Sequence, residues 1–346
     1  MYKRTPMKIL ISTGIYPPDI GGTAQFARNL YETWKLQGHD VKVAAYRWER
    51  AFPALVRHFL FFLKIFRKGW NADLIIILDT WSAAVPTMYA CGLMRKKYVV
   101  RTSADFLWES YVERTGDLVL FSDFYSSSLQ KLSAKERLVF KLGKKVLRKA
   151  SLVIYSTDWQ KKIFEKAYGL DPSRSGIVEN YCGEREEQIE PEGRVFVAGT
   201  RELRWKNIEA LKDAFKSAQE GIQSKGLEPI EFDTTKALYE NFQERMRRSY
   251  TVILASIGDM SPSIVFDAIR VGTPFIVTTE TGITDKVREC GIFVNPKDQR
   301  DIAEKIAWIS DPKNRASQAE KIRNFTWTHG WGDIGTEIIS LYERIK

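Results

Sequence analysis

The sequence contains few cysteines and no long apolar run, and these two shortages exclude several classes of protein. Its three cysteines, Cys91, Cys182 and Cys290, lie far apart and form no CxxC pair, so neither a disulfide framework nor a zinc site is predicted. No stretch approaches the roughly 18 apolar residues of a membrane-spanning helix, and the N-terminal segment lacks the apolar core of a signal peptide. A reducing, cytoplasmic environment is therefore expected.

Positive charge is abundant but unevenly spread. Residues 1–180 carry 29 Lys and Arg against 16 Asp and Glu, a balance of +13, and the remainder carries 24 against 27, or −3, which sum to the net +10. The N-terminal half therefore favours an anionic partner, such as a membrane surface, a phosphorylated acceptor or nucleic acid. Nucleic acid is the weakest of these, because the basic residues lack interleaved exposed aromatics and no recognised nucleic-acid module is present.

Apolar strands alternate with amphipathic helices in both halves of the 346-residue chain, a length that fits two domains. This alternation predicts an α/β protein with two facing Rossmann-like, doubly wound domains. We expect the first domain over residues 1–183 and the second over residues 184–330. A final helix over residues 331–346 is expected to pack back on the N-terminal domain.

The stretch from Ser256 to Pro274 reads as loop and helix between two apolar strands. Asp259 lies in the loop before the helix and Asp267 lies two turns inside it. Free N–H groups in the first turn of a helix bind anions, so the unit could hold a phosphate joined to a sugar, with the carboxylates accepting from hydroxyls. The alternative is that Asp259 caps the helix and Asp267 is simply solvated.

Three further segments place chemically active residues at strand ends. Arg201 and Lys206 follow the strand 195–199, where they could bind phosphate, although a solvated basic loop is the simpler interpretation. Asp105 and Glu109 follow the strand 97–101, the edge at which α/β sheets bind ligands, although ordinary loop acids would look the same. Gly21 and Gly22 lie where the first strand meets its helix and allow close approach of a ligand, but the pattern is not the GxGxxG of nicotinamide-binding proteins.

These segments together resemble the retaining glycosyltransferases of family 4, which have the GT-B fold. The resemblance is carried by TGIYPPDIGGTAQFARNL and GHDVKV near the start, by VAGTRELRWKNIEALKDAF at the start of the second domain, and by the Asp259–Asp267 segment through GTPFIVT. It implies that residues 1–183 form the N-terminal acceptor-binding domain and residues 184–330 the C-terminal donor-binding domain, the second one abbreviated beside the usual pattern. Asp259 would hold hydroxyls of the donor sugar, and Asp267 the ribose of its nucleotide. Arg201 and Lys206 would bind the diphosphate, and the loop with Gly21 and Gly22 would close over it.

The sequence departs from the family pattern at three points. It has Asp-x7-Asp where the family typically has Glu-x7-Glu, and Pro262, which has no N–H, stands where a glycine is usual. The N–H donors to the diphosphate are then expected from Ser261, Ser263 and Ile264. The usual histidine after the fourth strand is missing from the segment SADF, so Asp105 is the expected substitute, and the acceptor-side candidates are Tyr16, Trp108 and Glu109.

The resemblance implies transfer of a sugar, hexosyltransferase-like, from a nucleotide-diphosphate sugar to a glycan or a polyprenyl-phosphate-linked acceptor in cell-surface polysaccharide synthesis. No metal or other cofactor is expected, because no DxD motif or histidine cluster is present. The basic helices over residues 54–68 and 133–149 suit peripheral binding to the inner face of an anionic membrane, or are solvated helices whose apolar faces pack on the sheet. A nucleotide-sugar-binding protein that has lost turnover is the alternative function.

Overall fold

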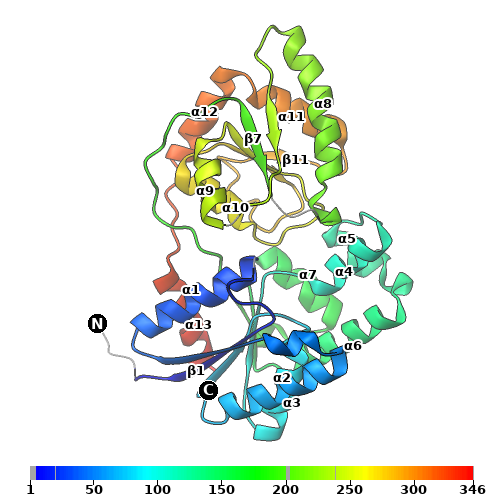
Figure 1. The fold of residues 1–346 in the computed structure, drawn as a ribbon, viewed down its shortest axis with the longest axis vertical. Coiled ribbons are helices and arrows are strands. Elements are labelled where there is room, and N and C mark those ends of the chain that lie inside the picture. The colour runs from blue at the N-terminus through cyan, green and yellow to red at the C-terminus, as the bar shows by residue number, and fades with distance from the viewer. Residues whose placement is uncertain (1–4, 20, 200–202, 238, 346) are drawn as a thin grey trace. The chain divides into compact units, whose positions relative to one another are not determined.

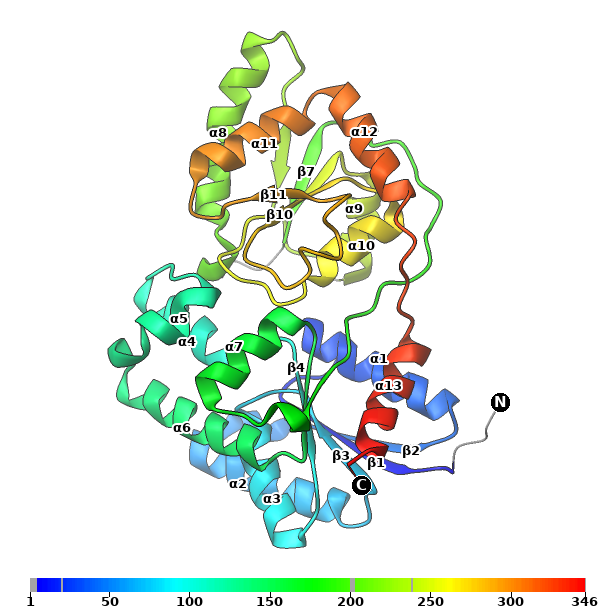
Figure 2. The same ribbon diagram turned by 180° about the vertical axis from the view of Figure 1, so that it is seen from behind.

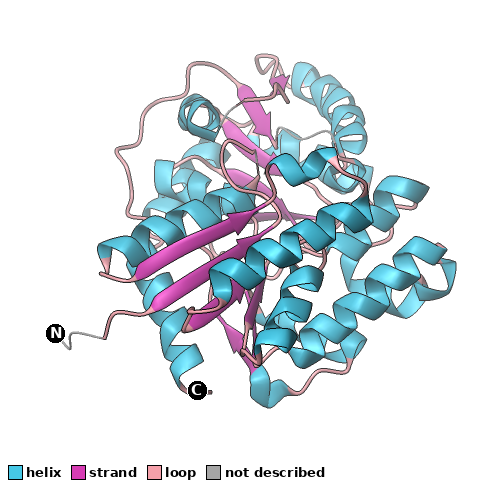
Figure 3. Cartoon of the chain, turned by 60° about the horizontal axis from the view of Figure 1, so that its bottom comes forward, coloured by secondary structure: helices cyan, strands magenta, loops and turns pink. Residues whose placement is uncertain are grey.

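The computed structural model describes residues 5–19, 21–199, 203–237 and 239–345. The chain forms two compact units, each a parallel sheet with helices on both faces (Figures 1 and 3). The first unit contains the described residues up to Leu107, together with Gln130–Asn180 and the segment that begins at Gly330. The second contains Trp108–Leu129 and Tyr181–His329. The predicted fold class, two α/β domains with parallel sheets, is confirmed.

The sheet of the first unit has six parallel strands in the order β2-β1-β3-β4-β5-β6. Its inner strands are short apolar runs such as Leu74–Ile77, all of whose residues are buried, which is typical of a parallel sheet covered on both faces. The strands are β1 (Lys8–Thr13), β2 (Asp40–Ala45), β3 (Leu74–Ile77), β4 (Val99–Thr102), β5 (Leu152–Tyr155) and β6 (Ser175–Ile177). The helices are α1 (Gly22–Leu36), η1 (Trp48–Ala51), α2 (Ala54–Gly69), α3 (Ala84–Met94), η2 (Leu129–Lys131), α6 (Ala134–Lys149), α7 (Asp158–Tyr168), η3 (Pro172–Arg174) and α13 (Trp331–Glu343).

The order of these strands divides the helices between the two faces. From β1 the chain first crosses to β2 at one edge of the sheet, and it then returns past β1 to β3 and continues to β6 at the other edge. Because each crossover is right-handed, α1 lies on one face of the sheet and the later helices lie on the other. The contacts agree, since α2, α3, α6 and α7 form one continuous layer while α1 contacts α13 (Figure 2). The C-terminal helix α13 therefore completes the face that α1 alone leaves partly uncovered.

A tryptophan joins α1 to α13. Trp34 is fully buried, and its Nε1 donates to the carbonyl of Gly335 over 3.1 Å. Gly335 has no side chain to interfere, and a Cβ there would lie 3.0 Å from the same Nε1. The close approach of α13 to the indole ring thus depends on the glycine.

The second unit repeats the pattern with five parallel strands in the order β11-β10-β9-β7-β8. One core lies between the sheet and the α8–α11 layer, and the other lies between the sheet and the α9–α10 layer. The strands are β7 (Val195–Ala198), β8 (Glu231–Asp233), β9 (Thr251–Leu254), β10 (Phe275–Thr278) and β11 (Ile292–Val294). The helices are α4 (Phe106–Thr115), whose first two residues belong to the first unit, α5 (Phe121–Ser127), η4 (Arg204–Lys206), α8 (Ile208–Ser224), α9 (Tyr239–Arg248), α10 (Ser263–Val271), α11 (Gln299–Ile309) and α12 (Pro312–Arg323).

The structure differs from the sequence-based expectations in three segments. The sequence predicts a short helix over residues 284–289, before the last strand of the second domain. These residues instead form successive turns in which the N–H groups of Lys286 and Val287 both donate to the carbonyl of Ile283. Residues 108–129, expected within the N-terminal domain, belong to the second unit. Helix α12 was not predicted, because its few buried residues give it almost no apolar stripe.

The Trp34 contact generates a prediction for stability. Replacing Trp34 by alanine leaves a cavity under α13 and removes the hydrogen bond to Gly335, so we expect the free energy of unfolding to fall by about 3–5 kcal/mol. Urea unfolding followed by far-ultraviolet circular dichroism measures this loss. Leu36→Ala on the same helix is the control, since Leu36 is 90% exposed and its loss should change stability by no more than about 0.5 kcal/mol. Equal effects of the two substitutions would contradict the role of Trp34.

Candidate functional site

The candidate site lies where the strand order of the second sheet reverses. From β7 the chain crosses to β8 on one side and then returns to β9 on the other, so β7 and β9 are neighbours whose following loops leave in different directions. In open α/β sheets ligands bind at such a switch point, beyond the carboxyl ends of the strands. Lys206 lies in the loop after β7 and Asp259 in the loop after β9.

Lys206 and Asp259 form an ion pair at this point. The Lys206 ammonium lies 2.9 Å from Oδ2 of Asp259, and the two side chains are 12% and 16% exposed. The ammonium also lies 4.3 Å from the centroid of the Trp205 ring, which gives it a cation–π contact. Because an ammonium has three N–H donors and a carboxylate has several acceptor positions, the pair holds both groups in place without exhausting either.

The backbones of the two loops are joined. The N–H of Ile257 donates to the carbonyl of Trp205 over 3.0 Å. Asn207, in the left-handed conformation with φ of 60°, donates through Nδ2 to the carbonyls of Ala255 and Pro296 over 3.1 and 2.8 Å. Asn207 was not among the residues singled out from the sequence; a short amide side chain in a β–α loop was the available signal for a positioning residue.

The backbone at Asp259 is also tied to the loop that follows β10. Its N–H donates to the carbonyl of Glu280 over 2.9 Å, and Asp259 pairs with Thr281 as an isolated parallel bridge. The N–H of Gly282 donates to the carbonyl of Met260 over 3.1 Å. Three successive loops at the carboxyl edge of the sheet therefore hold the Asp259 carboxylate in position.

Gly258 allows the α4–α5 segment to lie directly against the Asp259 loop. A Cβ on Gly258 would lie 2.5 Å from Cβ of Phe121 and 2.9 Å from Cη2 of Trp108. The N–H of Phe121 donates to the carbonyl of Ile257 over 3.1 Å. Trp108, an expected acceptor-side residue, is 1% exposed and donates to the carbonyl of Val119, so the structure places it in the wall beneath this loop.

Asp267 lies in a different environment from Asp259. It is 5% exposed on α10, and its carboxylate accepts hydrogen bonds from Tyr239 over 3.1 and 3.2 Å and from Gln243 over 3.3 Å, both on α9. Burial raises the pKa of Asp267 to about 6, against the opposing effects of Arg270 and of these hydrogen bonds. Among the described residues, Asp267 is contacted by polar side chains of α9 and α10, whereas Asp259 is paired with Lys206 from the loop after β7.

The N-terminus of α10 supplies backbone donors after Asp259. Pro262 has no N–H and no polar side-chain atom to cap the helix, and its carbonyl accepts from the N–H of Val265 over 3.1 Å. Ser263 and Ile264 are the first two residues of the helix, whose N–H groups have no acceptor within a helix. Ser263 is exposed, Ile264 is half-buried and Ser261 is buried.

The remaining residues expected around the donor and acceptor are dispersed. Arg201 lies outside the described residues. Asp105, in the first unit, is 1% exposed and its Oδ1 accepts from the N–H of Leu107 over 2.9 Å, which is the geometry of a helix cap at the start of α4. Glu109, half-buried on α4, belongs to the second unit.

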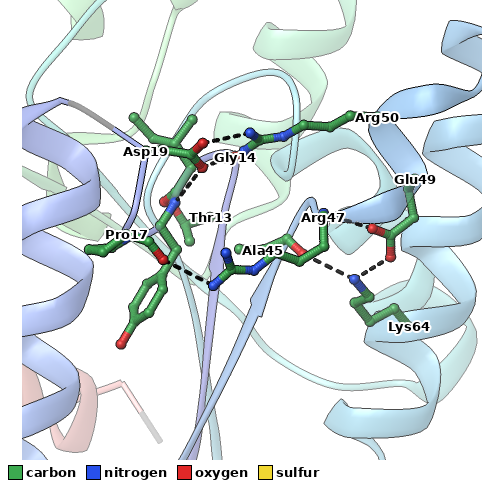
Figure 4. A network of polar contacts seen from close by, with 11 residues as sticks. Thr13, Gly14, Pro17, Asp19, Ala45, Arg47, Glu49, Arg50 and Lys64 are labelled. Carbon is green, nitrogen blue, oxygen red and sulfur yellow. Dashed lines mark hydrogen bonds and ion pairs between the residues drawn. The ribbon is translucent and has the colours of Figure 1, made fainter.

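A polar network in the first unit fixes the loop that leads to Gly21 and Gly22 (Figure 4). The Arg50 guanidinium binds both oxygens of Asp19 over 2.6 and 2.5 Å, which lowers the pKa of Asp19 to about 2. Arg50 also donates to the carbonyl of Gly14 over 3.2 Å. Gly21 then has φ of 157° and ψ of 153°, a conformation that essentially only glycine adopts, and its carbonyl accepts from the first turn of α1.

Tyr16 lies in the same loop. It is half-buried, its N–H donates to Asp19 over 3.1 Å, and the Arg47 guanidinium lies 5.9 Å from the centroid of its ring. Burial raises the pKa of the Tyr16 hydroxyl, so this group stays protonated and can donate at neutral pH. Gly22, which opens α1, is exposed, and a Cβ there would meet nothing within 4 Å.

A buried arginine at the end of β4 was missed by sequence reasoning. Arg101 is 3% exposed, stacks 3.7 Å from the centroid of Phe26, and donates to Asn180 over 2.5 Å and to Ser103 over 3.2 Å. Burial lowers the pKa of Arg101 to about 9. A charged residue inside the otherwise apolar run of a central strand was the signal that could have found it.

Each unit has a cavity whose lining includes neither Lys206 nor Asp259. One of about 320 Å³ in the second unit is lined by Cys182, Arg185 and Trp327, among others. Another of about 410 Å³ in the first unit is lined by residues of α1, β2 and α2, including Lys42 and Lys68. The candidate site is defined by the placement of its charged groups.

The sequence matches no family model and no curated protein. Solved structures nevertheless share its fold over nearly its whole length. HepE from Anabaena, in complex with UDP, is 17% identical with a TM-score of 0.66 over 98% of this chain and 100% of that one. Sucrose-phosphate synthase from Thermosynechococcus elongatus is 14% identical with a TM-score of 0.67 over 99% of each chain. WaaG, a glycosyltransferase involved in lipopolysaccharide biosynthesis, is 14% identical with a TM-score of 0.67 over 97% of this chain and 99% of its own.

These likenesses establish the fold of the chain. At identities of 17% and 14% they carry no residue-level role, because one α/β architecture supports many activities. The roles of Lys206, Asp259 and Asp267 depend on their own geometry.

The close approach at Gly258 can be tested by adding one methyl group. Gly258→Ala forces apart the Asp259 loop and Phe121, so we expect stability to fall by about 1–3 kcal/mol. Thermal unfolding measures the change. Gly221→Ala on α8 is the matched control, because a Cβ there meets nothing within 4 Å and alanine favours a helix by up to about 1 kcal/mol. Unchanged stability of Gly258→Ala would show that the loop does not need this contact.

The raised pKa of Asp267 predicts a pH dependence of stability. Below about pH 4 the carboxyl is protonated in both states; between about pH 4 and 6 the unfolded chain releases its proton while the folded protein retains it, so stability falls as pH rises. The loss should total about 3 kcal/mol and level off above pH 6. Asp267→Asn should remove this component, which the difference between the two proteins in urea unfolding from pH 4 to 8 measures. Parallel curves would contradict the prediction.

Proposed function

We propose that the protein is a glycosyltransferase that moves a sugar from a nucleotide-diphosphate sugar to an acceptor hydroxyl. The observation that carries the proposal is the Lys206–Asp259 pair, held at the switch point of the second sheet beside the N-terminus of α10. A cation, a carboxylate and free N–H groups at one sheet edge are the groups that a sugar diphosphate needs. The structures that share the fold include HepE with UDP and HepE with UDP and glucose, which supports a nucleotide sugar as the donor.

Each group at the edge has a proposed role. The Asp259 carboxylate accepts hydrogen bonds from hydroxyls of the donor sugar, while Lys206 and Arg201 neutralise the diphosphate. The N–H groups of Ser263 and Ile264, with Ser261 beside them, donate to phosphate oxygens. Three further residues complete the proposed donor site: Asp267 accepts from the nucleotide ribose, and the loop with Gly21 and Gly22 closes over the diphosphate.

The proposed role of Asp267 is compatible with its hydrogen bonds. A carboxylate has about four lone-pair positions, and Tyr239 and Gln243 occupy them only in part. Asp267 is 5% exposed, so the residue is not completely enclosed. A ribose hydroxyl that donates to the ionised form would lower the pKa of Asp267 and bind more tightly above pH 6.

We propose the retaining, metal-independent reaction of family 4. The acceptor oxygen attacks the anomeric carbon on the face from which the diphosphate departs, the bond from that carbon to the phosphate oxygen breaks, and the departing oxygen takes the acceptor's proton. Preorganised cations and N–H groups stabilise the negative charge that develops on the diphosphate. Asp105 is proposed to orient the acceptor or the sugar, with Tyr16 and Glu109 on the acceptor side.

The proposed acceptor is a glycan or a polyprenyl-phosphate-linked sugar in cell-surface polysaccharide synthesis. The charge of +13 on residues 1–180 supports a phosphorylated acceptor, because this half would attract it. An acceptor linked to a lipid would place the enzyme at the inner face of the membrane.

A nucleotide-sugar-binding protein without turnover is the second candidate. It is favoured by Asp105, which is 1% exposed and engaged with the N–H of Leu107, so that the expected replacement for the family's histidine contributes a helix cap in this structure. Such a protein would keep the donor site and lose transfer. Measuring donor binding and sugar transfer separately distinguishes the two functions.

The donor site is tested by replacing its cation. Wild type should show a raised thermal unfolding midpoint with UDP-glucose or another nucleotide sugar, because a ligand that binds only the folded state stabilises it. Lys206→Ala should lose this shift and lower the rate of donor turnover by about 10²–10³. Lys212→Ala is the matched control, since Lys212 pairs with Glu209 on the surface of α8, and it should behave as wild type.

Each outcome of this experiment discriminates between the functions. Donor binding with turnover that depends on Lys206 supports the transferase. Binding that depends on Lys206 without turnover of any donor, in the presence of glycan and polyprenyl-phosphate acceptors, supports the second candidate. An unfolding midpoint that no nucleotide sugar changes would refute both.

A further inference from the structure

The outer side of α2 and the turn before it expose large apolar side chains in a continuous sequence segment. These residues define an apolar ridge: Phe52, Leu55, Val56, Phe59, Leu63 and Trp70, which are 42%, 86%, 44%, 59%, 45% and 56% exposed. Single exposed apolar residues are ordinary on protein surfaces, but a contiguous group marks an interaction site.

Two half-buried rings, Phe62 and Phe66, connect Phe59 and Trp70 of the ridge along the helix. Phe59 lies 6.2 Å from Phe62, Phe62 lies 6.3 Å from Phe66, and Phe66 lies 5.2 Å from Trp70, measured between ring centroids. These residues are three or four positions apart and therefore share one side of the helix. The inner side of α2 is a separate apolar stripe of Phe61, Ile65 and Gly69, all buried. Packing on the sheet accounts for the inner stripe and leaves the ridge without a role in the core.

The charges around the ridge are almost all positive. Within residues 47–70 the only acid is Glu49, whose side chain is fully buried and paired with Lys64. Six basic residues stand against it: Arg47, Arg50, Arg57, Lys64, Arg67 and Lys68. Two of these charges are compensated, Lys64 by Glu49 and Arg50 by Asp19 outside this segment, and the segment keeps a net positive charge. The partner of this surface should therefore be negatively charged as well as apolar.

The other basic helix does not offer such a surface. On α6, the apolar residues Val139, Val146 and Leu147 are buried, as expected of a helix that packs on a sheet. Leu138, 51% exposed, is its single large apolar residue among the exposed ones. Of the lysines of α6, Lys144 and Lys145 are half-buried, and Lys145 lies against the Tyr89 ring, while the others are exposed. Of the two basic helices, α2 is the one that combines positive charge with several exposed apolar side chains.

We propose that the apolar ridge of α2 docks the protein on the surface of an anionic lipid bilayer. Aromatic and aliphatic side chains on a helix flanked by Arg and Lys are the composition that lies in the headgroup region, where the apolar groups enter the acyl boundary and the cations meet lipid phosphates. No helix among the described residues is long and apolar enough to cross a bilayer, so the contact is peripheral. This surface makes specific the membrane location proposed above and does not depend on sugar transfer.

The test is co-sedimentation of the full chain with vesicles. Wild type should bind phosphatidylcholine vesicles containing phosphatidylglycerol at low salt and bind pure phosphatidylcholine vesicles much less. Binding to the anionic vesicles should weaken in 0.5 M salt, because the Debye length falls to roughly 4 Å and the charges are screened. Leu55→Ser with Phe59→Ser should lower the partition coefficient at least about tenfold, because both side chains lose their apolar transfer. Leu36→Ser with Leu93→Ser is the matched control, since these residues are 90% and 66% exposed outside the ridge, and it should bind as wild type.

Three results would overturn the proposal. They are no binding of wild type to anionic vesicles at low salt, equal binding by wild type and the ridge variant, and sedimentation velocity that shows a wild-type dimer which the ridge variant dissociates. Unfolding midpoints equal to that of wild type show that the variants are folded. The thermal shift with a nucleotide sugar, measured on the same samples, reports the donor site separately, so loss of docking with an intact shift concerns the ridge alone.

Discussion

The candidate site depends on one constraint of the second sheet: all its strands run parallel, and their order reverses between β7 and β9. Because the strands are parallel, every loop that follows a strand lies at the same edge of the sheet, and the loops after β7 and β9 then leave in different directions. Since β7 and β9 are neighbours, Lys206 and Asp259 lie close together at that edge although they are distant in the sequence. The bonds from Asn207 and the Gly258 contact with α5 then fix the loops in detail.

The two aspartates of the α10 segment show how strongly environment separates similar residues. Asp259, partly exposed, faces an ammonium 2.9 Å away, so its charge is compensated where it stands. Asp267, 5% exposed, is held mainly by the hydroxyl of Tyr239 and the amide of Gln243, and its nearest cation, Arg270, is 3.7 Å away and also pairs with Glu186. Burial therefore dominates for Asp267 and raises its pKa to about 6. A sequence in which both appear as one Asp-x7-Asp pattern conceals this difference.

The alternation of strands and helices was sufficient to predict the two parallel sheets, because buried parallel strands such as Leu74–Ile77 are unmistakable apolar runs. Proximity of Lys206 to the Asp259 loop was likewise predictable from the rule for strand ends. One failure depended on long-range packing: the membership of residues 108–129 in the second unit follows contacts of Trp108 and Phe121 with Gly258, which leave no periodic signal in the sequence. The other was a choice between two local readings. Asp105 accepts a hydrogen bond from the N–H of Leu107 two residues on, and an aspartate before a helix is as typical of a cap as of a ligand-binding loop.

Helices α2 and α6 also differ in a way that their sequences alone do not show. Both are basic and amphipathic in sequence, but a helix with two apolar stripes cannot bury both against one sheet, and only the structure shows which stripe faces inward. In α2 the inner stripe of Phe61 and Ile65 takes the core position, and Phe59 and Trp70 remain exposed. Retaining so much exposed apolar surface costs solubility, and positive charge alone would be achieved as well by lysines on α6. Helix α2 has both exposed apolar side chains and positive charge. An anionic bilayer would contact both features, whereas a soluble anion would need only the charge.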